Sequence, residues 1–188
     1  MEIRVNPTRM ELNRLKRRLA MAVRGHKLLK DKRDELMRQF MILVRKNKAL
    51  REEVEGRLAR SFQKFMLARA VMSAEAVEEA IMFPQVQLEV EVGTQNIMSV
   101  HTPKLHWQQV GETSASIYPY GFAETSGELD DSISTLSELL PRLLELAEVE
   151  KAVNLLADEI ERTRRRVNAL EYVMIPELQK TVRYITMK

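Results

Sequence analysis

Four arginines crowd into five residues near the C-terminus: Arg162, Arg164, Arg165 and Arg166. Three interpretations are open, namely a solvated helix face, a nucleic-acid surface, or a contact for carboxylates on another protein. The nucleic-acid interpretation is the weakest, because no aromatic residues are interleaved and no known nucleic-acid-binding fold is recognisable. Arginine forks pair with carboxylates through bonds that are strong yet exchangeable. We therefore favour a protein partner that presents carboxylates, with the solvated face as the alternative.

The sequence fits no enzyme template. Gly25 stands alone between Arg24 and His26, so it belongs to no glycine-rich phosphate loop. The three histidines, His26, His101 and His106, lack the i, i+4 spacing with which a helix holds a metal ion. We therefore expect no catalytic residue, no metal site and no cofactor.

The acidic residues near position 130, the cysteine content and the apolar runs also give no sign of a catalytic, metal or membrane-inserted site. Glu128, Asp130 and Asp131 stand at the expected start of a helix, where the helix dipole stabilises carboxylates. The chain has no cysteine, which excludes disulfides and thiolate metal sites and fits a reducing cytosolic setting. No apolar run approaches 18 residues and the first ten residues do not resemble a signal peptide, so we expect no membrane insertion.

A long helix is predicted from Thr8 to about Phe62 or Phe65. Thr8 and Glu11 form a capping-box pattern at its start. Apolar residues then recur at alternating steps of three and four for more than five heptads, which is typical of a coiled coil. These seam positions are Leu12, Leu15, Leu19, Ala22, Leu29, Leu36, Phe40, Leu43, Leu50 and Val54. The same register places the polar residues His26, Arg33 and Asn47 on the seam, where they would specify register.

A second long helix is predicted from Asp130, Asp131 or Ser132 to the end of the chain. Its seam steps by three and four without a slip through Leu146, Val149, Val153, Leu156, Ile160, Thr163, Val167, Leu170, Met174, Glu177, Thr181 and Tyr184. Pro176 lies deep inside this pattern and lacks a backbone donor. We expect a kink at Pro176 and not the end of the helix.

Because one chain supplies both helices, they must pair antiparallel, and strict seven-residue spacing predicts a left-handed supercoil. The predicted fold class is therefore all-α dominated, a long two-helix coiled coil with a small middle segment. Pairing brings further basic residues to the surface around the arginine cluster. They are Arg14, Lys16, Arg17, Arg18 and Arg24.

The middle segment changes its periodicity. Residues 73–81 read as a short helix that ends before Pro84. Gly93 to Asn96 would then form the turn of a hairpin, and residues 103–128 would be loop. The apolar hairpin residues are Val86, Leu88, Val90, Val92, Ile97, Met98 and Val100. A lone hairpin is marginally stable, so it needs support from the helices or from a partner. We divide the chain into residues 1–68, 69–129 and 130–188.

Charge is segregated along the chain. Residues 1–60 carry a net charge of +10, residues 61–150 carry −10, and residues 151–188 carry +3. If the two ends pair, one tip of the molecule is basic and the other is acidic. Segregation this complete favours two different partners at the two tips over simple solvation.

Three stretches resemble the D subunit of the V-type and archaeal-type rotary ATPases. They are NPTRMELNRLKRRLAMAVRGHKLLKDKRDEL at 6–36, YGFAETSGELDDSI at 120–133 and RRRVNALEYVMIP at 164–176. The resemblance covers both helices and the entry to the second, while the hairpin region agrees mainly in layout. Members of that family usually continue past the position of Lys188 with a further charged stretch.

The resemblance implies a non-catalytic rotor shaft in the soluble ATPase sector, cytoplasmic and peripheral to the membrane. Its paired helices would enter a ring of alternating A and B subunits, which bind and hydrolyse ATP. Its foot would carry the F subunit and rest on the subunit that couples to the membrane rotor. The arginine cluster and the basic residues of the first helix would face the hexamer, and the hairpin would serve the F subunit. A static coiled-coil scaffold or adaptor is the alternative, and a nucleic-acid-binding coiled coil is a weaker third.

Overall fold

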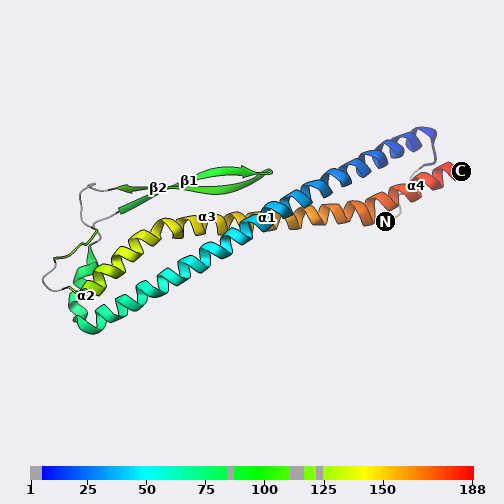
Figure 1. Cartoon of the computed structure of the whole chain (residues 1–188). Helices are drawn as coiled ribbons and strands as arrows, with labels where there is room; N and C mark the ends of the chain where they lie inside the picture. The colour runs from blue at the N-terminus through cyan, green and yellow to red at the C-terminus, as the bar shows by residue number, and fades with distance from the viewer. Residues whose placement is uncertain (1–5, 84–86, 111–116, 122–124) are drawn as a thin grey trace. The chain divides into compact units, whose positions relative to one another are not determined.

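The computed structural model describes residues 6–83, 87–110, 117–121 and 125–188 (Figure 1). The elements in chain order are α1 (Arg9–Val71), α2 (Ala74–Met82), β1 (Gln87–Ile97), β2 (Val100–Val110), α3 (Gly127–Ala169), the π-helical turn η1 (Leu170–Met174) and α4 (Ile175–Met187). The predicted fold class is confirmed, because long helices pack on each other and a short helix and an antiparallel hairpin lie in the middle of the sequence. No helix among the described residues is long and apolar enough to span a membrane.

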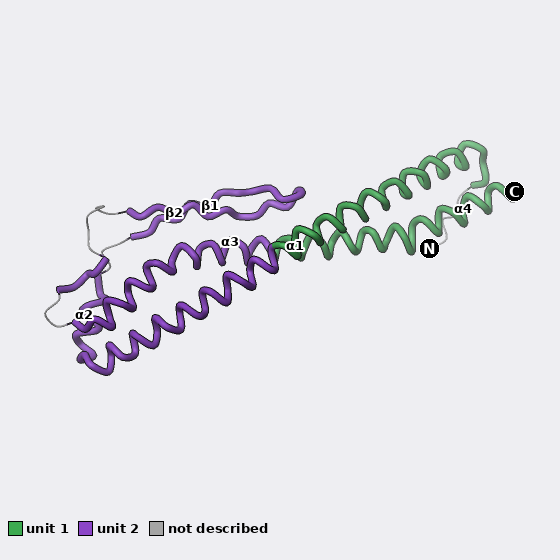
Figure 2. The backbone as a smooth tube through the Cα atoms, viewed as in Figure 1, with its two compact units in different colours: residues 1–42, 154–188 green, residues 43–153 purple. Residues whose placement is uncertain are grey.

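The chain forms two compact units (Figure 2). Unit 1 comprises residues 1–42 and 154–188, so the N-terminal part of α1 pairs there with the end of α3, with η1 and with α4. Unit 2 comprises residues 43–153 and pairs the rest of α1 with the first part of α3. Unit 2 also holds α2 and the hairpin.

Thr8 caps α1 as predicted, but only its half of the capping box forms. The Glu11 N–H donates to Thr8 Oγ1 at 3.3 Å, and the Leu12 N–H donates to the Thr8 carbonyl at 3.0 Å. The Thr8 N–H instead donates to the Asn6 carbonyl at 2.8 Å, while the Glu11 carboxylate lies 3.7 Å from Arg14. The local turn at Asn6 therefore replaces the return bond from Glu11.

The predicted unbroken seam of the second helix is wrong beyond Leu170. The Ile175 N–H donates to the carbonyl of Leu170, five residues back and not four, so η1 contains one extra residue in its turn. The chain stays helical through Pro176, as predicted. Proline has no N–H, and its ring clashes with the carbonyl four residues earlier, so the preceding turn is the natural place for this irregularity.

The extra residue moves every later core position by one. The core at this end of unit 1 contains Leu15, Leu178 and Ile185, and the partly buried residues packed against it are Leu12, Leu19, Ala22 and Val182. Leu178, Val182 and Ile185 thus replace the predicted Glu177, Thr181 and Tyr184. Burying a large aliphatic side chain is worth about 1.5–3 kcal/mol, whereas a perturbed backbone hydrogen bond costs about 0.5–1.5 kcal/mol. The burial of these aliphatic side chains therefore determines the register of α4.

The start of α3 is also corrected. The helix begins at Gly127, three residues before the predicted Asp130, and its first turn is closed by the Leu129 N–H on the Ser126 carbonyl at 3.0 Å. Leu129 is fully buried in a cluster with Ala68 of α1 and Ala80 of α2. Burial of this one leucine against two other helices explains why the helix begins early.

The hairpin turn lies four residues later than predicted. Strand β1 continues through Gly93 to Ile97, and the two-residue loop is Met98 and Ser99, with φ angles of 51° and 71°. The Ser99 N–H donates to Asn96 Oδ1 at 2.8 Å. Two consecutive positive φ angles usually require Asn-Gly or Asp-Gly, so this turn leaves no ordinary signal in the sequence.

Strand β2 accordingly extends to Val110, and the prediction that residues 103–110 are loop was wrong. Ile97 pairs with Val100, and the register then alternates hydrogen-bonded and non-hydrogen-bonded pairs. Pro103 faces Thr94 at a non-hydrogen-bonded pair, where the ladder needs no N–H. The proline is therefore compatible with a strand.

Candidate interaction surfaces

The predicted hexamer-contact residues all lie in unit 1 and all are exposed. This basic surface consists of Arg14, Lys16, Arg17, Arg18 and Arg24 on α1 and Arg162, Arg164, Arg165 and Arg166 on α3. Thr163, which interrupts the α3 arginines, and Val167, which follows them, are each 1% exposed. The arginines therefore lie off the seam, as their register predicted.

Few members of the basic surface are occupied by intramolecular partners. Arg165 pairs with Glu161 one turn earlier, Arg14 lies near Glu11, and Arg24 Nε donates to the Ala20 carbonyl at 3.4 Å. Within the described parts of the chain, the other six have no hydrogen bond or ion pair: Lys16, Arg17, Arg18, Arg162, Arg164 and Arg166. These six guanidinium and ammonium groups are available to an external partner.

A groove of 540 Å³ opens between α1 and α3 beside this surface. Its lining is Arg33, Asp34, Met37 and Phe40 from α1 and Ala157, Ile160, Glu161 and Arg164 from α3. Arg33 is one of the polar seam residues, and both Nε and Nη2 donate to Asp34 Oδ1, at 3.0 Å and 2.7 Å. The guanidinium is thus held against its own helix, so it does not bridge to α3.

The other two polar seam residues behave differently from each other. His26 Nε2 lies 3.3 Å from Glu171 Oε2 on η1, so His26 links the two helical segments of unit 1. Asn47, in unit 2, has a buried Oδ1 with no hydrogen-bond partner in the described chain. Of the three polar seam residues, only His26 thus makes a polar contact with the facing helical segment in the described part of the chain.

The predicted hairpin residues do not form one surface. Val86 lies outside the described residues. Leu88, Val90 and Val92 share one face of the hairpin, whereas Ile97 and the buried Val100 share the other. Met98 belongs to the turn and is 37% exposed. Among the described members of the set, Val92 is the most open to a partner, because it is 69% exposed.

The hairpin is supported by α3, as its marginal stability required. The Leu105 N–H donates to Glu148 Oε2 of α3 at 3.1 Å. Leu105 faces Val92 at a non-hydrogen-bonded pair, so its N–H points away from β1. Leu105 and Trp107 then line a hollow of 370 Å³ together with α3 residues such as Glu145. The outer edge of β2 therefore lies against α3.

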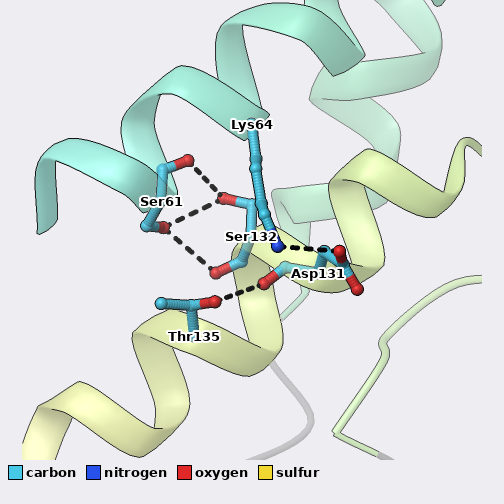
Figure 3. A network of polar contacts seen from close by, with 5 residues as sticks. All are labelled: Ser61, Lys64, Asp131, Ser132 and Thr135. Atoms are coloured by element: carbon cyan, nitrogen blue, oxygen red, sulfur yellow. Dashed lines mark hydrogen bonds and ion pairs between the residues drawn. The ribbon is translucent and has the colours of Figure 1, made fainter. Parts of the chain in front are cut away.

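A buried polar network ties α1 to α3 in unit 2 (Figure 3). Ser61 Oγ donates to the Ser132 carbonyl and Ser132 Oγ donates to the Ser61 carbonyl, both at 3.1 Å. Both serines are fully buried. Lys64 Nζ pairs with Asp131 at 2.7 Å beside them. Small side chains let the helices approach closely, and directional bonds fix their register there.

Sequence reasoning missed a set of exposed apolar side chains near the end of α1 and in α2, in unit 2. They are large side chains, each more than 50% exposed, in α1 and at the end of α2: Phe62, Met66, Leu67, Val71, Met82 and Phe83. The spacing of Phe62, Met66 and Leu67, off the seam, was the available signal.

The hydroxyl of Tyr120, also in unit 2, donates a hydrogen bond to Asp130 at 2.7 Å. Burial together with this hydrogen bond raises the pKa of the Tyr120 hydroxyl.

Comparison with known proteins gives a consistent result. Residues 11–188 match the family described as the D subunit of ATP synthase. The chain is 62% identical over 186 residues to the V-type ATP synthase D subunit of Acetivibrio thermocellus, covering 99% of this chain and 84% of that protein. It is 59% identical to the protein of the same name in Thermoanaerobacter sp. strain X514, covering 99% and 88%. For Clostridium novyi strain NT the identity is 57%, covering 99% and 87%. This chain belongs to the family of ATP synthase D subunits.

Proposed function

We propose that this protein is the non-catalytic central shaft of a V-type rotary ATPase, cytoplasmic and peripheral to the membrane. It would couple ATP hydrolysis or synthesis in a hexamer of A and B subunits to rotation and to ion transport across the membrane. The observation that carries the proposal is the basic surface of unit 1, displayed along two paired helices in a chain of this family. Unit 1 contains 19 Lys or Arg and 10 Asp or Glu, a net charge of +9.

The mechanism follows from linkage. A single asymmetric shaft in a threefold ring contacts three equivalent interfaces differently, so it biases each toward a different nucleotide state. The coupling is reciprocal, so nucleotide binding shifts the preferred angle of the shaft and torque on the shaft shifts nucleotide affinity. The contacts must each be weak, or rotation would stall. Exposed ion pairs worth about 0.2–1 kcal/mol meet this requirement.

Unit 2 would serve the partners outside the ring. It contains 11 Lys or Arg and 17 Asp or Glu, a net charge of −6, so it does not suit the partner that the basic surface suits. We assign the F subunit to the hairpin and the membrane-rotor coupling subunit to the same foot. The hairpin lies within the middle segment of the proposed division into residues 1–68, 69–129 and 130–188.

The rotor role is tested by ATPase rates of the purified hexamer with and without this chain. We expect the chain alone to hydrolyse no ATP and to change the turnover of the hexamer when it is added. A static scaffold would bind the hexamer without changing turnover. Hydrolysis by the pure chain would contradict the proposal.

The role of the foot is tested by replacing residues 87–110 with a short Gly-Ser linker. The shaft should still enter the hexamer, because the basic surface is intact, whereas turnover or binding of the F subunit should change. Loss of hexamer binding in this variant would contradict the assignment of hexamer binding to the basic surface and of F-subunit binding to the hairpin.

A further inference from the structure

The groove beside the basic surface has the features of a socket for a side chain from a partner. At this level the two flanks of the helix pair differ. Lys32 and Glu159 bridge one flank at 3.3 Å, and both side chains are no more than 30% exposed. Helical periodicity places Met37, Ala157 and Arg164 on the opposite flank, where the groove lies. One flank is therefore closed by an ion pair and the other is open.

The open flank has a local cause. Arg33 occupies a seam position but is held by Asp34 on its own helix. On the facing helix the groove is lined by Ala157, whose methyl group reaches little of the space. The walls are completed by Met37, 42% exposed, and by the partly buried Phe40. Because Arg33 is held on its own helix and the side chain of Ala157 is small, no side chain of the described residues covers the apolar walls of the groove.

The charged groups around the groove indicate what kind of partner group it would bind. Four charged groups border the groove, and three of them are neutralised locally: Arg33 and Asp34 pair with each other, and Glu161 pairs with Arg165. Arg164 has no intramolecular partner among the described residues. The rim therefore offers one uncompensated cation beside an apolar hollow, within a unit of net charge +9.

We propose that this groove receives an apolar side chain of a ring subunit that carries an aspartate or glutamate within about one helical turn of it. The apolar side chain fills the space between Met37 and Ala157, and the carboxylate pairs with Arg164. This inference rests on the proposed function and refines it. In this proposal Arg164 differs from the other arginines of the basic surface, because it lies at a groove that binds a specific side chain.

The first experiment fills the groove from within. Ala157 is exposed, so Ala157→Leu occupies the hollow without disturbing the buried core. We expect this variant to bind the purified A/B hexamer about tenfold more weakly, which is the effect of losing one apolar contact worth about 1.4 kcal/mol. Ala169→Leu is the matched control, because Ala169 is an exposed alanine of α3 that does not line the groove. The control should bind like the wild type.

The second experiment separates the two parts of the socket by their salt dependence. Arg164→Ala should weaken binding severalfold at low ionic strength and much less at high ionic strength, because salt screens exposed ion pairs. The loss in Ala157→Leu should persist at high salt. Arg162→Ala is the control for charge, since Arg162 is exposed on the same helix but does not line the groove. The double variant Ala157→Leu with Arg164→Ala should lose less than the two single losses combined, because both act on one partner segment.

The outcomes distinguish the socket from the general proposal. Wild-type affinity in Ala157→Leu, together with weakened binding when the whole arginine cluster is removed, would overturn the socket and leave the shaft function standing. Equal effects of Arg162→Ala and Arg164→Ala would also overturn it. If the wild-type chain does not bind the hexamer at all, the proposed function itself fails. Self-association of the chain that Ala157→Leu abolishes would make a second copy the occupant and overturn the inference.

Discussion

Both units combine apolar packing with polar contacts between their paired helices, but the core at the end of unit 1 and the buried serine network of unit 2 differ in chemistry. The end of unit 1 is joined by Leu15, Leu178 and Ile185, which pack without directional bonds. In unit 2 the apolar contact of Leu129 with Ala68 is accompanied by two buried serines of α1 and α3, each of which bonds the other's backbone. Apolar packing supplies more free energy, whereas the hydroxyl bonds specify register.

This contrast shows how a two-helix protein fixes its register. An apolar seam tolerates a slip of one residue, and unit 1 contains such a slip at η1. A reciprocal pair of buried hydroxyl bonds does not tolerate one, because a slip would leave buried polar groups without partners. We therefore expect substitutions in the unit 1 core to cause the larger loss of stability. Substitutions in the serine network of unit 2 should mainly weaken the preference for one helix register.

The largest expected effect tests the slip in unit 1. Leu178→Ala should lower the free energy of unfolding by about 2–5 kcal/mol, because Leu178 is 2% exposed in the core. Tyr184→Ala should cost much less, because Tyr184 is 53% exposed. Urea unfolding followed by circular dichroism measures both. A larger loss for Tyr184→Ala would restore the uninterrupted heptad pattern and remove the contrast between the units.

The next effect concerns hexamer affinity and the basic surface of unit 1. Removing Arg162, Arg164, Arg165 and Arg166 together should weaken binding by about 1–3 kcal/mol at low salt, while a single change outside the groove should be nearly silent. The stability of the free chain should hardly change, because all four are exposed. Arginine-to-lysine substitution at all four positions is the control that keeps the charge. Equal affinities of the wild type and the alanine variant at low salt would make the cluster a solvated face.

A smaller effect tests the serine network of unit 2. Ser61→Ala should cost about 0.5–1.5 kcal/mol of stability, the usual contribution of one hydrogen bond. Ser132→Ala in the same chain should add less than its own single cost, since the two hydroxyls share partners. Gln63→Ala, at an exposed position of α1, is the control. Strict additivity in thermal or urea unfolding would mean that the serines act independently.

The smallest effect appears only at high pH and belongs to unit 2. The pKa of Tyr120 is raised in the folded state, so its contribution is complete below the unfolded value of about 10. That contribution is lost as the pH rises through the folded-state pKa, because unfolding then releases a proton. Tyr120→Phe should therefore unfold with a weaker pH dependence above pH 10. Identical alkaline profiles for the two proteins would contradict the coupling of Tyr120 to Asp130.

Several features were predictable because they depend on neighbours in sequence. The seam from Leu12 to Val54 follows from periodicity, and the Thr8 cap follows from local backbone geometry. Pro176 located the irregularity in the second helix, since a missing N–H affects the turn before it. The off-seam placement of the arginine cluster also needed only the register of Thr163 and Val167.

Only the tertiary structure decided the rest. The extra residue of η1 forms because Leu178 and Ile185 gain a core with Leu15, a residue more than 150 positions earlier. The hairpin turn at Met98 and Ser99 is set by the register of eleven strand pairs, which outweighs the turn signal at Gly93. The groove exists because Arg33 bonds to Asp34 opposite an alanine on α3. The sequence by itself thus determined the helices and their charge, whereas long-range burial decided their register.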